Sequence, residues 1–197
     1  NVFGDSGRPF YNSVVATFCH QVTHGEEPTI NQDGQMSMVY INDLVSDIYN
    51  LIATRKETYT VEYIKPRAEL KVSELLAMLN KFKDFYYGSG MVPEIKSDMQ
   101  RDLYNTFITY MDEADWQRNL KLNTDDRGSF IEVFKLEKGG QVSFSTTKPG
   151  ITRGNHYHIR KNEKFCVLSG NACIKLRRIG TDKVIEYNVS GDQPAWV

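Results

Sequence analysis

Hydrophobic residues in the first half of the chain recur at the spacing of amphipathic helices. Apolar side chains three and four residues apart predict helices over residues 12–23, 42–52, 73–86 and 96–110. Asn12 or Ser13 is expected to cap the first helix, and Gly25 to end it. The second helix is expected to be capped by Asn42 or Asp43 and to bury a stripe of apolar side chains, formed by Leu44, Val45, Ile48, Leu51 and Ile52.

Short segments of alternating or β-branched residues predict strands. They are expected at residues 29–30, 36–40 and 58–64, where Pro66 ends the last segment. After residue 122 the helical period disappears, and strands are expected at residues 129–135, 141–147, 165–168, 172–177 and 184–189. Closely spaced short strands are typical of a β-barrel or sandwich. The polar stretch 111–122 therefore separates an α/β part, residues 1–115, from an all-β part, residues 116–197.

Composition narrows the choice of partners and compartment. The 197 residues carry a net charge of −1, which gives no argument for nucleic acid or anionic lipid as a partner. No apolar run is long enough to cross a bilayer, so no membrane partner is expected. Cys19, Cys166 and Cys173 have apolar neighbours and are expected to be buried free thiols of a cytoplasmic protein. Both ends of the sequence are expected to lie inside a longer protein.

Residues 156–170 contain the strongest candidate chemistry. His156 and His158 are two residues apart, so an extended strand would place both imidazoles on one face. Glu163 is within reach across a turn, and Gly170 is expected to close the next tight corner. Two imidazoles and a carboxylate suit a divalent metal such as zinc. The alternative is two hydrogen-bonded or surface histidines near an unrelated acid.

The spacing His-x-His-x4-Glu-x6-Gly resembles the first motif of the cupins. The resemblance implies a small antiparallel barrel with a metal held by His156, His158 and Glu163. A further histidine would come from a second motif that begins after Gly191, and this histidine is expected after Val197, so the cupin barrel is incomplete in the sequence. Some cupin barrels keep the fold without the metal, so the resemblance implies the architecture more strongly than metal binding.

The residues before the histidines resemble the dTDP-sugar epimerase branch of cupins, through Asp125-Asp126-Arg127-Gly128-Ser129-Phe130 and Arg153-Gly154-Asn155-His156. The resemblance implies that Arg127 and Arg153 contact a diphosphate, which a planar guanidinium can bind in a bidentate way. It also implies that His156 is the catalytic base. That role conflicts with metal binding through a neutral ring nitrogen, unless a metal polarises the keto oxygen while another group moves the proton. The simpler alternative is that Arg127 only ties down a turn.

The first part resembles the C-terminal part of extended short-chain dehydrogenases, through Asn1-Val2-Phe3-Gly4, residues 8–19 and residues 39–45. In those enzymes this part forms the sugar-nucleotide side of the cleft. Asn12 and Ser13 can hydrogen-bond a substrate, although helix capping explains both equally well. This first part, residues 1–115, has neither a glycine-rich dinucleotide loop nor a Tyr-x-x-x-Lys pair. The Rossmann half and its NADPH site are therefore expected upstream, and no cofactor-binding residue is assigned.

Taken together, the two parts resemble the CapF-type family of capsule-biosynthesis enzymes and their O-antigen relatives. The resemblance implies a homodimeric, bifunctional enzyme on the way to UDP-N-acetyl-L-fucosamine. Its zinc cupin would epimerise carbon 3 of a UDP-2-acetamido-2,6-dideoxy-4-hexulose, and its dehydrogenase domain would reduce the ketone with NADPH. This chain alone is not expected to carry out the reduction. The alternatives are a single-activity keto-sugar isomerase and a non-enzymatic, metal-stabilised sugar-binding module.

Overall fold

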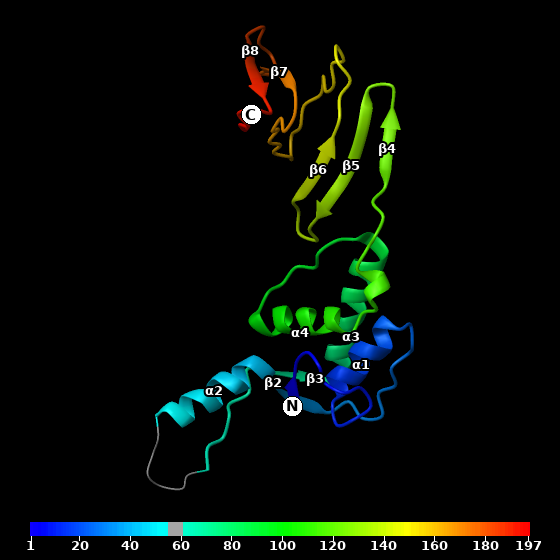
Figure 1. Ribbon diagram of the computed structural model, residues 1–197, viewed down its shortest axis with the longest axis vertical. Coiled ribbons are helices and arrows are strands. Elements are labelled where there is room, and N and C mark those ends of the chain that lie inside the picture. The colour runs from blue at the N-terminus through cyan, green and yellow to red at the C-terminus, as the bar shows by residue number, and fades with distance from the viewer. Residues whose placement is uncertain (55–60) are drawn as a thin grey trace. The chain divides into compact units, whose positions relative to one another are not determined.

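The computed structural model describes residues 1–54 and 61–197 (Figure 1). The chain divides into two compact units, Asn1–Ile151 and Thr152–Val197. The first unit contains a helical region followed by three strands, and the second contains a two-stranded ribbon. The boundary expected between residues 115 and 116 lies within the first unit, and it stays a prediction about domain organisation.

A small mixed sheet with the order β1-β2-β3 lies at the start of the first unit. The central strand β2 (Gln35–Tyr40) pairs in parallel with β1 (Val2–Phe3) and antiparallel with β3 (Ala68–Lys71). The prediction of a strand at residues 29–30 was wrong, because those residues form no regular element. Part of the strand expected at 58–64 lies outside the described residues. Its described part, 61–64, is not a strand, and the chain joins the sheet only at β3.

Three of the predicted helices enclose the core of the first unit. They are α1 (Val14–Thr23), α3 (Val72–Lys83) and α4 (Asp98–Thr109), and a π-helical turn, Asp84–Ser89, continues α3. A short 3-10 helix, Glu113–Asp115, follows α4. The fully buried side chains include Val15, Cys19, Leu75, Leu79, Leu103 and Phe107. These side chains come from all three helices. The apolar faces predicted from the periodicity of these segments are therefore the buried faces.

Helix α2 (Ile41–Ala53) departs from the prediction. It starts directly after β2, and Tyr40 is its N-cap without a side-chain hydrogen bond, so neither Asn42 nor Asp43 caps it. None of its residues is buried, and Val45 and Ile52 are 57% and 64% exposed. The expected buried stripe was therefore wrong for the described chain. Apolar periodicity identifies an apolar face, but it does not show whether another segment covers that face.

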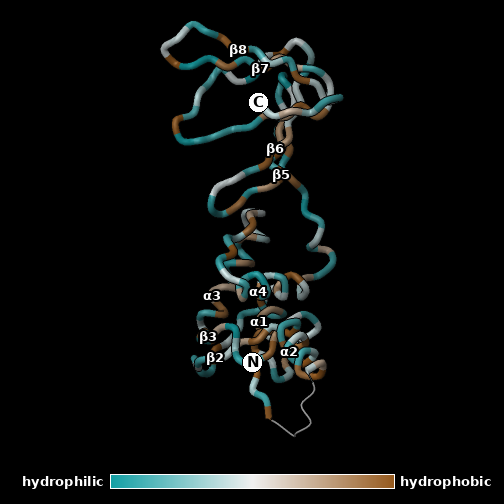
Figure 2. Tube along the Cα trace, turned by 90° about the vertical axis from the view of Figure 1, so that its left-hand side faces the viewer, coloured by the Kyte–Doolittle hydropathy of each residue, from teal (hydrophilic) through white to brown (hydrophobic). Residues whose placement is uncertain are grey.

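The remaining strands form two separate sheets. β4 (Leu122–Asp125), β5 (Gly128–Lys135) and β6 (Gln141–Ser145) make an antiparallel sheet in that order, and β5 is bulged between Glu132 and Phe134. β7 (Asn171–Arg177) pairs with β8 (Val184–Ser190) in the second unit. Figure 2 shows that hydrophobic and hydrophilic residues both occur along this ribbon. No strand covers 165–168 among these described residues, where only Cys166 bridges to Trp196.

The expectation that all three cysteines are buried was wrong for two of them. Cys19 is buried in α1, and burial raises the pKa of its thiol well above the ordinary value. Cys166 and Cys173 are also free, but both are exposed. None of the residues 152–197 is buried, so the apolar sequence neighbours of these two cysteines do not cover them.

Candidate metal centre

The two candidate histidines lie in an irregular segment, so the expectation that a strand would align them was wrong. Residues 151–158 have no regular secondary structure, and a bend follows at residues 159–160. Gly154 and Asn155 have left-handed backbones, with φ of 100° and 58°. Gly170, as expected, turns the chain with φ of 77° immediately before β7. The local chain reversal, rather than strand pleat, brings the histidines near Glu163.

The structure nevertheless gathers the three predicted side chains in one place. His158 Nε2 lies 3.1 Å from Glu163 Oε2, and His156 Nε2 lies 3.9 Å from the same oxygen. The two imidazole rings meet edge to face, with centroids 4.8 Å apart. One possible ligand atom from each residue lies within 4.8 Å of the other two. Within the described ranges, 1–54 and 61–197, this is the one group of three such residues that can hold a metal.

The donor set fits a tetrahedral divalent ion. Zinc bonds of about 2.0–2.2 Å place neighbouring ligand atoms roughly 3.4 Å apart. The two distances to Glu163 Oε2, 3.1 and 3.9 Å, lie on either side of that separation. His156 and His158 have 54% and 34% exposed side chains, against 25% for Glu163. The acid is therefore the most enclosed member, and the open side of the cluster is formed by the imidazoles.

Lys161 is part of this cluster, although the sequence pattern did not single it out. Its Nζ lies 2.5 Å from Glu163 Oε1, whereas Oε2 faces the imidazoles. The hydrogen bond from Lys161 is the main cause that lowers the pKa of Glu163, and the nearby His158 lowers it further against the effect of burial. The carboxylate therefore stays ionised, which is the form that binds a metal. The sequence signal that could have identified Lys161 is its position two residues before Glu163.

Arg127 lies in the turn between β4 and β5 and is already paired. Its backbone N–H donates to Asp125 Oδ1 at 2.9 Å, and its guanidinium contacts Asp125 Oδ2 at 2.9 and 2.6 Å. Arg153 is half-buried, three residues before His156. The contact of either arginine with a diphosphate remains a prediction.

Asn12 and Ser13 lie just before α1. The Ser13 hydroxyl accepts a hydrogen bond from the Ala16 N–H at 3.2 Å, so Ser13 is the N-cap that the sequence allowed. Asn12 is exposed and has a left-handed backbone, with φ of 51°. Their contact with a substrate stays a prediction.

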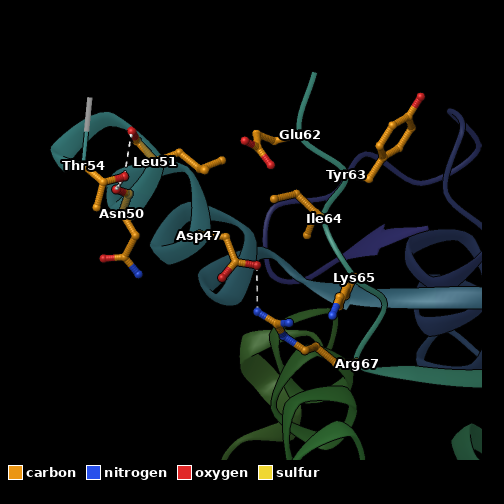
Figure 3. Close-up of a pocket in the computed structure, with 9 residues that line it drawn as sticks. All are labelled: Asp47, Asn50, Leu51, Thr54, Glu62, Tyr63, Ile64, Lys65 and Arg67. Carbon is orange, nitrogen blue, oxygen red and sulfur yellow. Dashed lines mark hydrogen bonds and ion pairs between the residues drawn. The ribbon is translucent and has the colours of Figure 1, made fainter. Parts of the chain in front are cut away.

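A pocket that was not predicted from the sequence lies between α2 and residues 62–67, where a strand was expected as far as residue 64 (Figure 3). It has a volume of about 330 Å³. Arg67 lies on its wall and pairs with Asp47 at 2.7 Å and with Asp43 at 3.7 Å. The lining is mixed, with aliphatic, amide, hydroxyl and charged groups from Asp47, Asn50, Leu51, Thr54, Glu62, Tyr63, Ile64, Lys65 and Arg67.

Known proteins resemble this chain over almost its whole length. A UDP-2-acetamido-2,6-beta-L-arabino-hexul-4-ose reductase from Pseudomonas aeruginosa is 34% identical over 194 residues, which are 98% of this chain and 52% of that protein. The crystal structure of the capsular polysaccharide assembling protein CapF from Staphylococcus aureus matches all of this chain and 54% of its own, with a TM-score of 0.86 and 39% identity. This chain is similar to CapF over its whole length. The resemblance expected from the sequence is thereby confirmed.

Further comparisons support the same relationship. Residues 123–197 match the family described as the polysaccharide biosynthesis C-terminal domain. The crystal structure of CapF with the inhibitor 3-isopropenyl-tropolone also has a TM-score of 0.86 and 39% identity, and the chain covers 58% of it. The spore coat polysaccharide biosynthesis protein SpsL from Bacillus subtilis is 31% identical over 70 residues, which are 33% of this chain and 46% of SpsL.

The chain spans about half the length of the relatives it matches. Its mixed α and β architecture agrees with the predicted fold class, whereas the assignment to a dehydrogenase tail and a cupin remains a prediction. Among the described residues, none of the helices combines the length and apolar character that a membrane crossing requires.

Proposed function

We propose that this chain is part of an enzyme that makes a nucleotide-sugar precursor of a capsular or related polysaccharide. The likeness to the keto-sugar reductase and to CapF supports this assignment. The polysaccharide biosynthesis family match over residues 123–197 supports it independently of the helical region. The substrate would be a UDP-linked 4-keto sugar, bound by a homodimer.

The specific form of this proposal is a bifunctional enzyme. The part with the histidine cluster would epimerise carbon 3 of UDP-2-acetamido-2,6-dideoxy-4-hexulose. The dehydrogenase part would then reduce the 4-ketone with NADPH, bound by residues outside this chain, towards UDP-N-acetyl-L-fucosamine. The observation that carries the epimerase step is the convergence of His156, His158 and Glu163 in a chain of this family.

His156, His158 and Glu163 would hold zinc, which when bound would stabilise the negative charge that develops on the keto oxygen. Lys161 keeps Glu163 ionised and fixes one of its oxygens. His156 is a catalytic residue of the proposal as a ligand of this ion, on the exposed side of the cluster. Because a neutral ring nitrogen that binds the ion cannot also accept a proton, another group would take the proton from carbon 3, and a proton would return on the opposite face.

Arg127 and Arg153 would bind the diphosphate and so orient the sugar. Guanidinium groups suit this task because two parallel N–H groups match two phosphate oxygens. Asn12 and Ser13 would contact the substrate from the dehydrogenase part. Ser13 would do so while its hydroxyl also caps α1, since a hydroxyl can donate one hydrogen bond and accept others.

The deciding experiment is exchange of the carbon 3 proton in deuterated water, without any nicotinamide. We expect the protein that carries this chain, loaded with zinc, to incorporate deuterium at carbon 3 of the keto-sugar. His156→Ala should abolish the exchange, whereas His24→Ala, which changes a histidine in the other unit, should not.

The alternatives give different results in this experiment. No exchange in the zinc-loaded wild type would favour a sugar-binding module over an epimerase. Exchange without any later hydride transfer from added NADPH would favour a single-activity isomerase. Undiminished exchange in His156→Ala would remove His156 from the catalytic role.

A further inference from the structure

Helix α2 has a continuous aliphatic side that the first unit leaves largely uncovered. Its apolar residues recur three and four positions apart, so they share one side of the helix. The residues of this side, here called the α2 surface, are Leu44, Val45, Ile48, Leu51 and Ile52, and all except Leu44 are exposed. Of the residues that the structure describes between positions 41 and 64, none belongs to the hydrophobic core of the first unit.

The start and the polar side of α2 are held by other parts of the first unit. Asp43 and Asp47 on the polar side pair with Arg67 at 3.7 and 2.7 Å. The helix begins directly after β2, and its first residue, Ile41, lies so close to Gly4 that a Cβ there would collide with it. These contacts fix which side of α2 is uncovered, so the α2 surface belongs to a positioned helix.

Residues 61–64 extend the exposed apolar region next to α2. They are rich in β-branched and aromatic residues, which favour strands, yet they have no regular secondary structure. Val61 and Tyr63 are exposed, and Tyr63 lines the same pocket as Leu51 of the α2 surface (Figure 3). The buried stripe and the strand predicted from the sequence are thus both missing in adjacent segments. One neighbour outside this chain would account for both.

The chemistry of the α2 surface narrows the kind of neighbour. Helix α2 carries two aspartates and neither lysine nor arginine, so an anionic lipid surface would repel it rather than attract it. Transient protein interfaces concentrate their binding energy in tryptophan, tyrosine and arginine. The α2 surface consists of aliphatic side chains alone, which is the composition of a permanent contact that resembles a domain interior.

The size of the α2 surface favours a neighbour in the same polypeptide. A helix of 13 residues is about 20 Å long and about 10 Å wide, so one side presents roughly 200 Å². A stable contact between separate proteins needs about 800 Å² from each partner. A covalently linked neighbour loses less translational and rotational freedom, so a smaller surface is sufficient. The relatives, of which this chain covers 52% and 54%, are long enough to contain such a neighbour.

We propose that the α2 surface, with Val61 and Tyr63 beside it, is the site at which the NADPH-binding half of the complete protein packs against this chain. The inference rests on the proposed function, in which residues outside this chain bind NADPH. It gives the apolar period of α2 a partner, because burial of these side chains would hold the two halves together. In residues 1–197 alone the surface is exposed, so substitutions on it should have the small effects of other surface positions.

The test measures how fast iodoacetamide modifies single cysteines placed on α2 in the complete protein. Val45→Cys and Ile52→Cys report on the α2 surface, and Ser46→Cys is the matched control on the opposite side of the helix. Mass spectrometry of the α2 peptide separates these sites from Cys166 and Cys173. The thiols at positions 45 and 52 should react at least about tenfold more slowly than the thiol at position 46, because a buried thiol reacts only when the structure opens.

A charge on the α2 surface should release the contact. Ile52→Asp, combined with Val45→Cys, should raise the reaction rate at position 45 to within about twofold of the rate at position 46, because an unpaired carboxylate is costly to bury. Ser46→Asp adds the same charge on the opposite side of α2 and should leave position 45 protected. Equal effects of the two aspartates would overturn the inference, because the charge would then act on the whole helix rather than on one side.

Three further outcomes would overturn the inference. Equal reaction rates at positions 45, 46 and 52 would show that nothing covers the α2 surface. Protection that disappears when the protein is diluted would show that a second copy covers it. NADPH binding, measured by calorimetry on the same protein, distinguishes these failures from failure of the proposed function. If NADPH binds while positions 45 and 52 react freely, the proposed function stands and only the docking site is lost. If NADPH does not bind, the reducing half is wrong, and the inference is overturned with it.

Discussion

The helical region of the first unit and the whole second unit differ in how they are stabilised. The buried hydrophobic side chains all lie between Phe3 and Met111. None of the residues 152–197, all of which the structure describes, is buried, yet these residues carry His156, His158 and Glu163. Segments below about 70 residues rarely form a sufficient core and often depend on a metal or an association. Apolar burial and candidate chemistry are thus separated along the chain.

Truncation of a core leucine should have the largest effect and should not involve the second unit. Leu103 is fully buried in α4, so Leu103→Ala is expected to lower the free energy of unfolding by about 2–5 kcal/mol. Ile48→Ala, at a 44% exposed position of α2, should change it by no more than about 0.5 kcal/mol. Urea unfolding followed by circular dichroism measures both. Similar losses in the two variants would contradict the assignment of the core to α1, α3 and α4.

Zinc should stabilise the second unit by an intermediate amount. At free zinc about 100 times the dissociation constant, binding adds about 2.7 kcal/mol to the native state. The gain should disappear in His158→Ala and in Glu163→Gln, and it should persist in His20→Ala. Trp196 lies in the second unit, with the Lys164 ammonium 4.1 Å from its ring, and offers a local fluorescence signal alongside thermal melting. Identical melting temperatures with zinc and with a chelator would contradict the proposed metal site.

A smaller effect is expected from Tyr110, which joins α4 to the loop before α1. Its hydroxyl donates to the Gly7 carbonyl at 2.6 Å, so Tyr110→Phe should cost about 1 kcal/mol. Burial, followed by the nearby Cys19 and Asp5, raises the pKa of Tyr110 to about 12. The unfolded chain loses this proton near pH 10, before the folded chain does.

The pH dependence of Tyr110 has a defined sign. Its contribution to stability should be complete below pH 10 and should be lost as the pH rises towards 12. The difference in unfolding free energy between wild type and Tyr110→Phe, measured from pH 8 to 12, isolates this group from the other tyrosines. A constant difference across that range would show that Tyr110 is not enclosed as described.

The sequence predicted best where one local signal decides the structure. The period of α1, α3 and α4 reflects faces that pack within the same unit, and Ser13 caps α1 because its hydroxyl needs only the nearby Ala16 N–H. The association of His156 and His158 with Glu163 also followed from short spacing, even though the segment is not a strand.

The sequence failed where structure depends on distant partners. β3 is a strand because Leu70 and its neighbours pair with β2, at least thirty residues earlier, and its four residues were too short a pattern to predict a strand. β4 similarly depends on its hairpin with β5. The exposure of α2 could not be foreseen, since Val45 and Ile52 form an apolar face whether or not the chain covers it. The Asp125 partner of Arg127 is local, but residue identity alone does not say which edge of the guanidinium is occupied.

Gly128 has a consequence for how this sequence can vary. The backbone of Thr146 comes so close that even a methyl group at position 128 would collide with a carbonyl, and the positive φ adds a second penalty. In a library with all twenty amino acids at each position, variants at 128 should be depleted almost as completely as those in the helical interior. The need for glycine at position 128 thus constrains the sequence in a region where almost no side chain is buried.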